Sequence, residues 1–597
     1  MKSFGRSLLI QFLALVIFVI VGFALLFLMA FVADANKTAV VPNSVLILNL
    51  SASFPESVRD GSPVGLIQRT INDTKTGALP LSGVLQALDR ASRDDSISAL
   101  YLTGNVNPRG YSSGPAALKE LRDAILNFKV KSGKPVIAYN HSWTKWEYYL
   151  CSCASKLYVN PSGEVDCTGI LAESAFFAGA LKKYGVDVQV TRVGKYKSAV
   201  EPYLFGRMSP AGREQLSGLL GDIWDDWKNS ISADRKLTPV DIQMMSDTQG
   251  ILSATKALEV GLVDRLVSPD QVLDEIKTLA GRKACDADFP QVTMDTYMRT
   301  VTPSRSRNKI ALVVAEGEIV DGNGRGGQVG GDRLSRELRE LRFDPQVKAI
   351  VVRVNSPGGS AMASELIQRE LILARKEKPV VVSMGHLAAS GGYWISTYAD
   401  RIFAEPNTIT GSIGVYGLLP NIKKLANNHG VTWDGVQTSK LSGITTITRP
   451  KSVVELAKIQ EMVDGVYDQF LDRVSASRGI SKDLVSNIAQ GRVWSGRQAL
   501  KIGLVDELGG MQDAISYAAK LAKIDGDYNI NMFSETRTPL ERIFRLLCDE
   551  ESHAFSESNC GLLGELCSHF DGIIGNIQAL NDPYGVYVRM PFDAYFR

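Results

Sequence analysis

The sequence is poor in cysteine and almost neutral in charge. Its 597 residues include seven cysteines, and 66 lysines and arginines nearly balance 64 aspartates and glutamates, giving a formal net charge of +2. Seven cysteines are too few for a disulfide-stapled scaffold, and their odd number leaves at least one thiol unpaired. A charge this small, without a basic stretch interleaved with aromatic residues, argues against nucleic-acid binding. What remains is a globular composition, long enough for about two to four domains.

Charged residues are also absent from residues 12–33. This stretch is long enough to cross the roughly 30 Å hydrocarbon core of a bilayer as one helix. Because Lys2 and Arg6 precede it, the positive-inside rule keeps residues 1–11 in the cytoplasm and the body of the chain on the periplasmic side. A signal peptide cleaved near "ADA" (33–35) is the alternative, although its apolar region normally runs only about 7–15 residues. The sequence predicts a single-pass anchor of the inner (cell) membrane.

The chain contains an internal repeat. "ATKALEVGLVDRL" (254–266) and "SGRQALKIGLVDEL" (495–508) share the pattern A-L-x-x-G-L-V-D. A shift of 245 residues aligns a second, longer region without a gap, matching Tyr148 with Tyr393, Ala154 with Ala399, Pro161 with Pro406, Gly169 with Gly414, Gly185 with Gly430 and Lys195 with Lys440. Repeats of this kind indicate a duplicated structural unit. We expect one copy at 45–302 and another at 308–530, joined by the polar, proline-containing segment 303–308.

Within each copy, apolar strands alternate with helices. "KAIVVRV" (348–354), "PVVVSM" (379–384) and "RIFAEP" (401–406) are typical of buried strands, and residues 363–378 have the apolar spacing of a helix. Such alternation favours a largely parallel sheet covered on both faces. Each copy is therefore predicted to be an α/β unit.

Two glycine-containing loops in the second copy follow predicted strands. "NSPGGS" (355–360) and "AASGG" (388–392) should lie side by side at the carboxyl edge of the sheet, where parallel sheets place their sites. Gly358, Gly359 and Gly391 would let backbone N–H groups approach a ligand, beside the hydroxyl of Ser390. Each loop alone has a structural alternative, since Gly-Gly turns reverse chains and serines before helices act as N-caps.

A serine hydroxyl needs a base before it can act as a nucleophile. His386 precedes Ser390 by four residues, but on a strand this spacing does not bring two side chains together as it would on a helix. A buried, neutral lysine is the other route, as in Ser-Lys hydrolases. Lys197, in "RVGKYKSAVEPY" (192–203), has the small and apolar neighbours that such a lysine requires, although a solvated lysine there remains the alternative. Lys440 of the second copy is a rival base.

Several of these motifs together resemble one peptidase family. "NSPGGS", "MGHLAASGGYWIS", "TGSIGV" (410–415), "RVGKYKSAVEP" and the paired G-L-V-D segments are similar to the long, duplicated form of the signal peptide peptidase A (protease IV) family. The resemblance implies a ClpP/crotonase-like fold and a membrane-anchored serine endopeptidase that degrades hydrophobic remnant signal peptides. It also implies a homotetramer, and neither a cofactor, a metal nor a nucleic acid is expected.

The resemblance also implies roles for individual residues. Ser390 matches the nucleophile and Lys197 the general base of a Ser-Lys dyad. Gly358 and Gly359 match the oxyanion loop, and Ser412 matches a serine that supports the lysine. Since each copy would contribute one member of the dyad, the first copy is expected to be a degenerate partner that supplies the lysine.

The shift of 245 residues agrees with this division. It places Lys145 opposite Ser390 and Ser442 opposite Lys197, so neither copy contains both members of a dyad. Cys167 likewise stands opposite Ser412.

Two other functions stay open from the sequence. An acyl-CoA enzyme of the crotonase type needs a carboxylate near the thioester, which neither glycine loop supplies. A non-catalytic scaffold that binds peptides is the second alternative. No role is predicted for the C-terminal tail (531–597), where six residues separate Cys560 from Cys567 before His569, a spacing wider than that of usual zinc sites.

Overall fold

The computed structural model describes residues 40–56, 77–106, 113–301, 304, 306–533 and 586–590. The predicted anchor and the three cysteines after residue 540 lie outside these ranges. No helix within them has both the length and the apolar character needed to cross a membrane.

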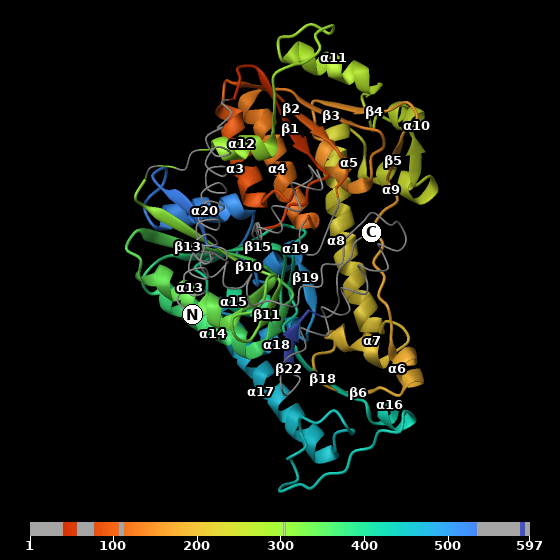
Figure 1. The fold of residues 1–597 in the computed structure, drawn as a ribbon, viewed down its shortest axis with the longest axis vertical. Coiled ribbons are helices and arrows are strands. Elements are labelled where there is room, and N and C mark those ends of the chain that lie inside the picture. The colour runs from red at the N-terminus through yellow and green to blue at the C-terminus, as the bar shows by residue number, and fades with distance from the viewer. Residues whose placement is uncertain are drawn as a thin grey trace, which may run out of the picture.

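The first copy is built on a six-stranded sheet in the order β8-β4-β3-β2-β1-β9, in which all neighbouring strands are parallel. Its central strands are short apolar runs, as buried parallel strands require. The strands are β1 (Ser44–Asn49), β2 (Ile97–Thr103), β3 (Val136–Asn140), β4 (Lys156–Val159), β8 (Arg265–Leu266) and β9 (Gln291–Thr293). Helices α3 (Leu81–Arg93) and α4 (Pro115–Ser132) pack against each other beside it (Figure 1).

The second copy is built on an eight-stranded sheet. Its main path runs β19-β17-β15-β13-β10-β21, with β16 beside β15 and β20 beside β16. The strands are β10 (Lys309–Glu316), β13 (Val347–Ser356), β15 (Val380–Ala389), β16 (Arg401–Ala404), β17 (Ile409–Gly411), β19 (Val493–Ser495), β20 (Glu507–Leu508) and β21 (Asn529–Phe533). Only β19 is antiparallel to its neighbour in this sheet. Strand β21 reaches past the predicted end of the second copy.

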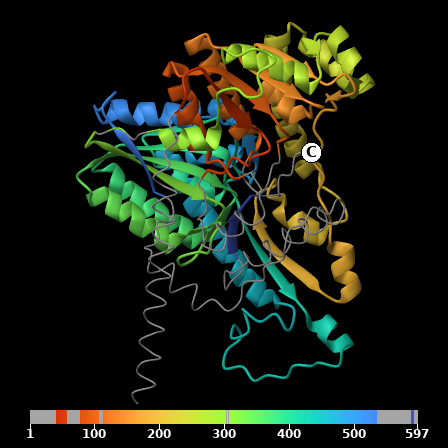
Figure 2. The ribbon, with the colours of Figure 1, turned by 45° about the horizontal axis from the view of Figure 1, so that its top comes forward.

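The duplication is visible in the elements themselves. The shift of 245 residues carries β4 onto β16, and also β5 (Glu164–Asp166) onto β17. A shift of 242 carries β7 (Ile251–Ser253) onto β19 and α11 (Pro269–Leu279) onto α20 (Met511–Leu521). Each copy also has one helix of 26 residues, α8 (Pro210–Arg235) and α17 (Val453–Arg478), which extend toward the lower part of the molecule in Figure 2. The chain is therefore a duplicated α/β unit, as predicted.

A third sheet joins the two copies. Its order is β12-β11-β14-β22-β18-β6. Strand β6 (Asp187–Val193) belongs to the first copy, and β18 (Val415–Asn421) belongs to the second. They pair in antiparallel register, with Val193 opposite Val415. The remaining members are β11 (Glu318–Val320), β12 (Gln328–Gly330), β14 (Gly358–Ser360) and β22 (Val586–Arg589).

A buried ion cluster also links the copies. The guanidinium of Arg353, on β13, donates to the carboxylates of Glu56 and Glu120 of the first copy. All three side chains are buried. Because a buried charge is costly unless it is paired, Arg353 of the second copy and the two carboxylates of the first copy depend on each other.

Candidate active site

A lysine of the first copy and two serines of the second copy meet at one point. The Nζ atom of Lys197 lies 2.9 Å from Oγ of Ser390. It also lies 3.0 Å from both the carbonyl oxygen and Oγ of Ser412. All three residues are fully buried. The predicted serine, lysine and supporting serine are thus in direct contact.

The pairing of β6 with β18 explains how Lys197 reaches the second copy. Val193 and Val415 are opposite each other, so Lys197, just after β6, comes beside Ser412, just before β18. The loop is fixed further by the N–H of Tyr196, which donates to the carbonyl of Gln490 at 2.8 Å.

Two glycines and one side-chain amide surround Lys197 and the loop that carries it. A Cβ at Gly491 would lie 2.7 Å from Cβ of Lys197, and one at Gly414 would lie 3.2 Å from its Cδ. From α8, the buried amide of Gln215 donates at 2.9 Å to the carbonyl of Tyr196 and to Oγ of Ser198. These contacts confine the side chain of Lys197, whose amine lies against Ser390. The sequence alone did not identify Gln215 or Gly491, because neither belongs to a motif and Gly491 lies almost 300 residues from Lys197 in the chain.

Burial changes the chemistry of the lysine. Desolvation alone lowers the pKa of Lys197 well below its ordinary value, because no neighbouring charge in the described part of the chain offsets it. A neutral amine has two N–H donors and one lone pair. The two oxygens of Ser412 accept the donors, which leaves the lone pair directed at the hydroxyl of Ser390.

Ser390 and Ser412 both adopt left-handed backbone conformations that non-glycine residues rarely occupy. Ser390 has φ 56° and ψ −111°, and Ser412 has φ 52°. Their N–H groups are held by the carbonyls of Gly411 (2.8 Å) and Arg492 (2.7 Å). Ser390 directly follows β15 and is the N-cap residue of the short helix α15 (Gly391–Ser396), but its side chain makes no capping hydrogen bond there. Strained residues held in place by their surroundings are concentrated at functional sites.

The predicted glycines converge beside Ser390. A Cβ at Gly358, which has φ +96°, would lie 2.6 Å from the nitrogen of Gly391. A Cβ at Gly391 would lie 3.1 Å from Cα of Gly358 and 3.2 Å from the nitrogen of Gly359. Only glycine permits this close approach. Gly358 and Gly359 do not form a plain loop as expected, since they belong to the short strand β14.

The rival bases lie elsewhere. His386 is buried within β15, where its ring abuts Gly114 of the first copy, and burial lowers its pKa to about 4. Lys440 is exposed. Lys195 is exposed too, with its Nζ 5.0 Å from the ring centre of Tyr196. None of the three is a hydrogen-bond partner of Ser390 in the described structure.

The equivalent place in the first copy has different chemistry. Lys145 stands where Ser390 stands in the second copy, and its Nζ donates to the carbonyl of Gly169 and lies 4.0 Å from Asp166. Burial raises the pKa of the Cys167 thiol to about 12, which keeps it protonated and a weak nucleophile. The first copy therefore holds no activated nucleophile at this position.

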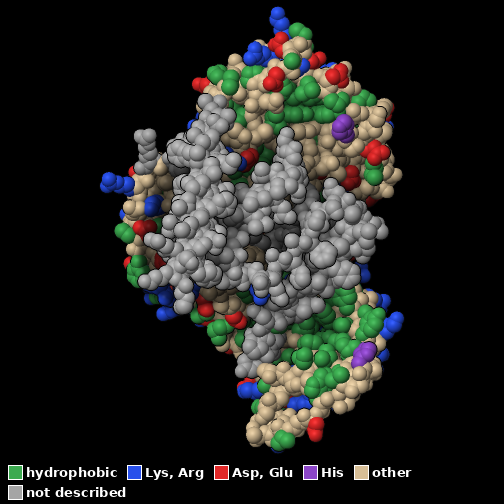
Figure 3. Space-filling model, viewed as in Figure 1, with side chains coloured by type: hydrophobic (Ala, Val, Ile, Leu, Met, Phe, Trp, Pro, Cys, Tyr) green, Lys and Arg blue, Asp and Glu red, His purple; other side chains and the backbone are tan. Residues whose placement is uncertain are grey.

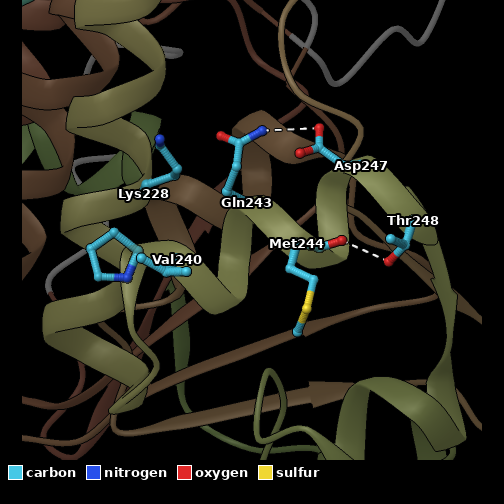
Figure 4. A pocket seen from close by; sticks show the side chains of 7 residues that line it. Lys228, Val240, Gln243, Met244, Asp247 and Thr248 are labelled. Carbon is cyan, nitrogen blue, oxygen red and sulfur yellow. Dashed lines mark hydrogen bonds between the residues drawn. The ribbon is translucent and has the colours of Figure 1, made fainter.

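We looked for a second catalytic or metal-binding site in the rest of the described structure. A hollow beside α9 (Pro239–Thr248) is lined by Lys228, Val240, Gln243, Met244, Asp247 and Thr248 (Figure 4). Its polar groups bond to one another along the helix, as when Thr248 donates to the carbonyl of Met244 at 2.6 Å. Among the described residues, no group of three or more His, Cys, Asp or Glu is placed to hold a metal ion.

Comparisons with known sequences relate this chain to one peptidase family. The profile of peptidase family S49 matches residues 129–283 and 372–525. Protease 4 of Salmonella typhi is 35% identical over 530 residues, covering 86% of this chain and 84% of its own. The chloroplastic serine protease SPPA of Arabidopsis thaliana is 31% identical, covering 81% of this chain and 72% of its own. Among solved structures, ClpP1 of Listeria monocytogenes is 19% identical with a TM-score of 0.22, covering 34% of this chain and 92% of its own.

Proposed function

The chain belongs to peptidase family S49 and is a serine protease; on that premise we propose that Ser390 and Lys197 form its catalytic dyad. The observation that carries the proposal is the 2.9 Å contact between the buried Lys197 amine and the Ser390 hydroxyl. Burial favours the neutral amine, which is the form that can accept a proton.

The reaction begins when Ser390 attacks the carbonyl carbon of a peptide bond. Its hydroxyl proton passes to Lys197, and Ser412 keeps the lysine directed at the serine through both of its oxygens. The tetrahedral oxyanion accepts hydrogen bonds from the N–H groups of Gly391 and Gly358. In the structure the N–H of Gly358 donates to Oγ of Ser356 at 3.2 Å. In the reaction this N–H would donate to the oxyanion instead.

Collapse of this intermediate breaks the peptide bond. The leaving nitrogen takes the proton from Lys197, and the acyl group stays esterified to Ser390. Lys197, neutral again, then removes a proton from water, which attacks the ester; as the second product leaves, the oxygen of Ser390 takes that proton from Lys197, and the dyad is restored. Gly359 has a different task in this proposal, since its place in β14 suits it to pair with an extended substrate backbone.

The substrates in this proposal are hydrophobic remnant signal peptides. The sequence motifs shared with signal peptide peptidases support this choice, as does the enclosed apolar surrounding of Ser390. The anchor at 12–33 would keep the protein in the inner membrane, where such remnants are released, with its body on the periplasmic side.

The finer architecture is also part of the proposal. Each copy (45–302 and 308–530) is assigned the ClpP/crotonase-like fold, and the assembly is a homotetramer. Support for self-association comes from apolar side chains gathered on the lower part of the face in Figure 3, near β6 and β18. Exposed apolar side chains of neighbouring segments include Tyr184, at the end of α6 (Ala178–Tyr184), and Val431, Trp433 and Val436, which follow α16 (Lys423–Asn428).

Hydrolysis of a synthetic signal peptide by the detergent-solubilised full chain tests the function. We expect fragments from the unaltered protein and none from Ser390→Ala. Binding without fragments would favour the peptide-binding scaffold, and turnover of an acyl-CoA thioester in place of peptide would favour a crotonase-type enzyme.

The predicted topology has its own test. External protease added to cells with a permeabilised outer membrane should degrade the body of the chain and spare the N-terminal residues. A soluble mature protein starting near Asn36 would show that the apolar segment is a cleaved signal peptide instead.

A further inference from the structure

A strand from the far C-terminus lies between β14 and β18. In the third sheet, β22 pairs with β14 on one side and with β18 on the other, antiparallel to both. Without β22, the edges of β14 and β18 would face each other across a gap one strand wide. Unpaired strand edges of this kind accept an extended chain through backbone hydrogen bonds. The gap is therefore a groove for a peptide, and the chain fills it with its own residues.

The register places this strand against the glycine loop of the active site. Tyr587 is opposite Ser360, Val588 is opposite Gly359, and Arg589 is opposite Gly358. One step further, the N–H of Met590 donates at 2.7 Å to the carbonyl of Pro357. A Cβ at Gly358 would lie only 2.2 Å from the carbonyl oxygen of Val588. Glycine is thus needed for the strand to approach so closely.

The strand is enclosed on both faces. Val588 is 0% exposed and Met590 is 4% exposed. Tyr587 joins a buried apolar cluster with Val200, which follows Lys197 by three residues, and with Tyr416. The guanidinium of Arg589 lies 3.7 Å from the carboxylate of Glu318. Enclosure this complete leaves no room for a second peptide in the same groove.

Met590 occupies the end of the groove that is nearest to the catalytic serine. Its side chain is buried in one apolar cluster with Leu387 and Ala389, the latter directly preceding Ser390. The cluster also contains Ile409 and Val493 from strands β17 and β19. An apolar pocket beside a nucleophile is the place for the residue whose carbonyl is attacked.

We propose that residues 586–590 are a built-in pseudosubstrate, with Met590 in the position of the residue that donates the scissile carbonyl. This inference rests on the proposed function of Ser390 and Lys197. It identifies the substrate as an extended strand with an apolar side chain at that position, because such a chain must replace β22 before it can be cut.

The sequence explains why the protein does not cleave this segment. The residue after Met590 is Pro591, so the bond at the site of attack would be a tertiary amide. Proline carries no N–H, and its ring fixes φ and crowds the nitrogen that must accept a proton before it can leave. The segment therefore binds as a substrate does and resists cleavage.

Removing the apolar anchor tests occupancy of the groove. Met590→Asp, in the detergent-solubilised full chain, should release the strand, because an unpaired carboxylate is costly in an apolar pocket. If β22 leaves the groove open only about a tenth of the time in the unaltered protein, KM for a fluorogenic peptide should be about tenfold lower in Met590→Asp than in the unaltered protein. Met244→Asp, on exposed α9 far from the groove, is the matched control and should leave KM unchanged. An active Met590→Asp protein with unaltered KM would overturn the inference.

Changing the proline tests the position of Met590. Pro591→Ala converts the bond into an ordinary peptide bond, so we expect mass spectrometry to find a chain that ends at Met590. The double variant Pro591→Ala, Lys197→Ala should stay intact. A Pro591→Ala protein that hydrolyses added peptide but keeps residues 591–597 would overturn the inference while leaving the proposed function standing. Absence of peptide hydrolysis in every variant would instead refute the proposed function, and this inference with it.

Discussion

Nζ of Lys197 and Oγ of Ser390 lie 2.9 Å apart although 193 residues separate them in the chain. The lysine follows β6, the strand that the first copy contributes to the third sheet, and the serine directly follows β15 of the second copy. Neither copy holds both groups, so the proposed dyad needs both copies. The pairing of β6 with β18 is what brings the halves of the dyad together.

The first prediction separates the three candidate lysines. Lys197→Ala should lower kcat for a peptide ester at least about 10²-fold, because it removes the general base. Lys195→Ala and Lys440→Ala serve as matched controls and should keep most activity, since both side chains are exposed. Loss of activity in Lys440→Ala with retention in Lys197→Ala would show that the dyad forms within the second copy.

The second prediction concerns pH. Only the neutral form of Lys197 accepts a proton, so kcat/KM should rise with pH as this lysine loses its proton. Since burial lowers the pKa of Lys197, the rise should be complete well below the ordinary lysine value of about 10.4. A pH profile of peptide ester hydrolysis measures it. A rise centred near the ordinary value would show that the lysine acting as base is solvated.

The third prediction concerns the glycine pair beside the serine. In Gly391→Ala, the new Cβ would lie 2.7 Å from Oγ of Ser364 and 3.1 Å from Cα of Gly358, which forces the two oxyanion donors apart. We expect kcat to fall about 10²–10³-fold, as when one oxyanion donor is lost. Gly326→Ala, where no heavy atom lies within 4 Å of the added Cβ, should have normal kcat. Equal rates for both variants would exclude the glycine from oxyanion stabilisation.

The fourth prediction addresses the contact between the copies. Arg353→Met leaves the buried carboxylates of Glu56 and Glu120 without their cation and should reduce the free energy of unfolding by about 3–5 kcal/mol. Arg375→Met breaks the exposed pair with Asp400 and should cost about 0–1 kcal/mol. Urea denaturation followed by tryptophan fluorescence measures both. Similar midpoints for the two variants would show that the buried cluster does not stabilise the interface.

The sequence predicted the elements whose signals are local or repeated. Continuous apolar runs indicated β13, β15 and β16, and the repeated G-L-V-D pattern placed corresponding elements in both copies. Strand β15 is longer than predicted because residues 385–389, which carry no strand signal of their own, continue it to Ala389. Ser390 and Lys197 were identified by motif and resemblance, the resemblance implied that they form a dyad, and the offset between the copies agreed with it.

Long-range pairings left no such signal. The register of β6 against β18 depends on segments more than 200 residues apart. Gln215 contacts the loop that follows β6, so its role depends on the same pairing. The C-terminal strand is shorter than most strands and lies in a tail for which the sequence indicated no role. Its place in the fold becomes clear only in the structure, where it fills the gap between β14 and β18.

Covalent labelling of the detergent-solubilised full chain with a fluorophosphonate tests the central claim most directly. The probe reacts with a serine whose hydroxyl is activated as a nucleophile, and an oxyanion site favours the reaction. We predict one adduct per chain, mapped by peptide mass spectrometry to Ser390, and its loss in Lys197→Ala. A folded protein that hydrolyses peptide and yet carries the label on another serine, or no label at Ser390, would contradict the Ser390–Lys197 dyad.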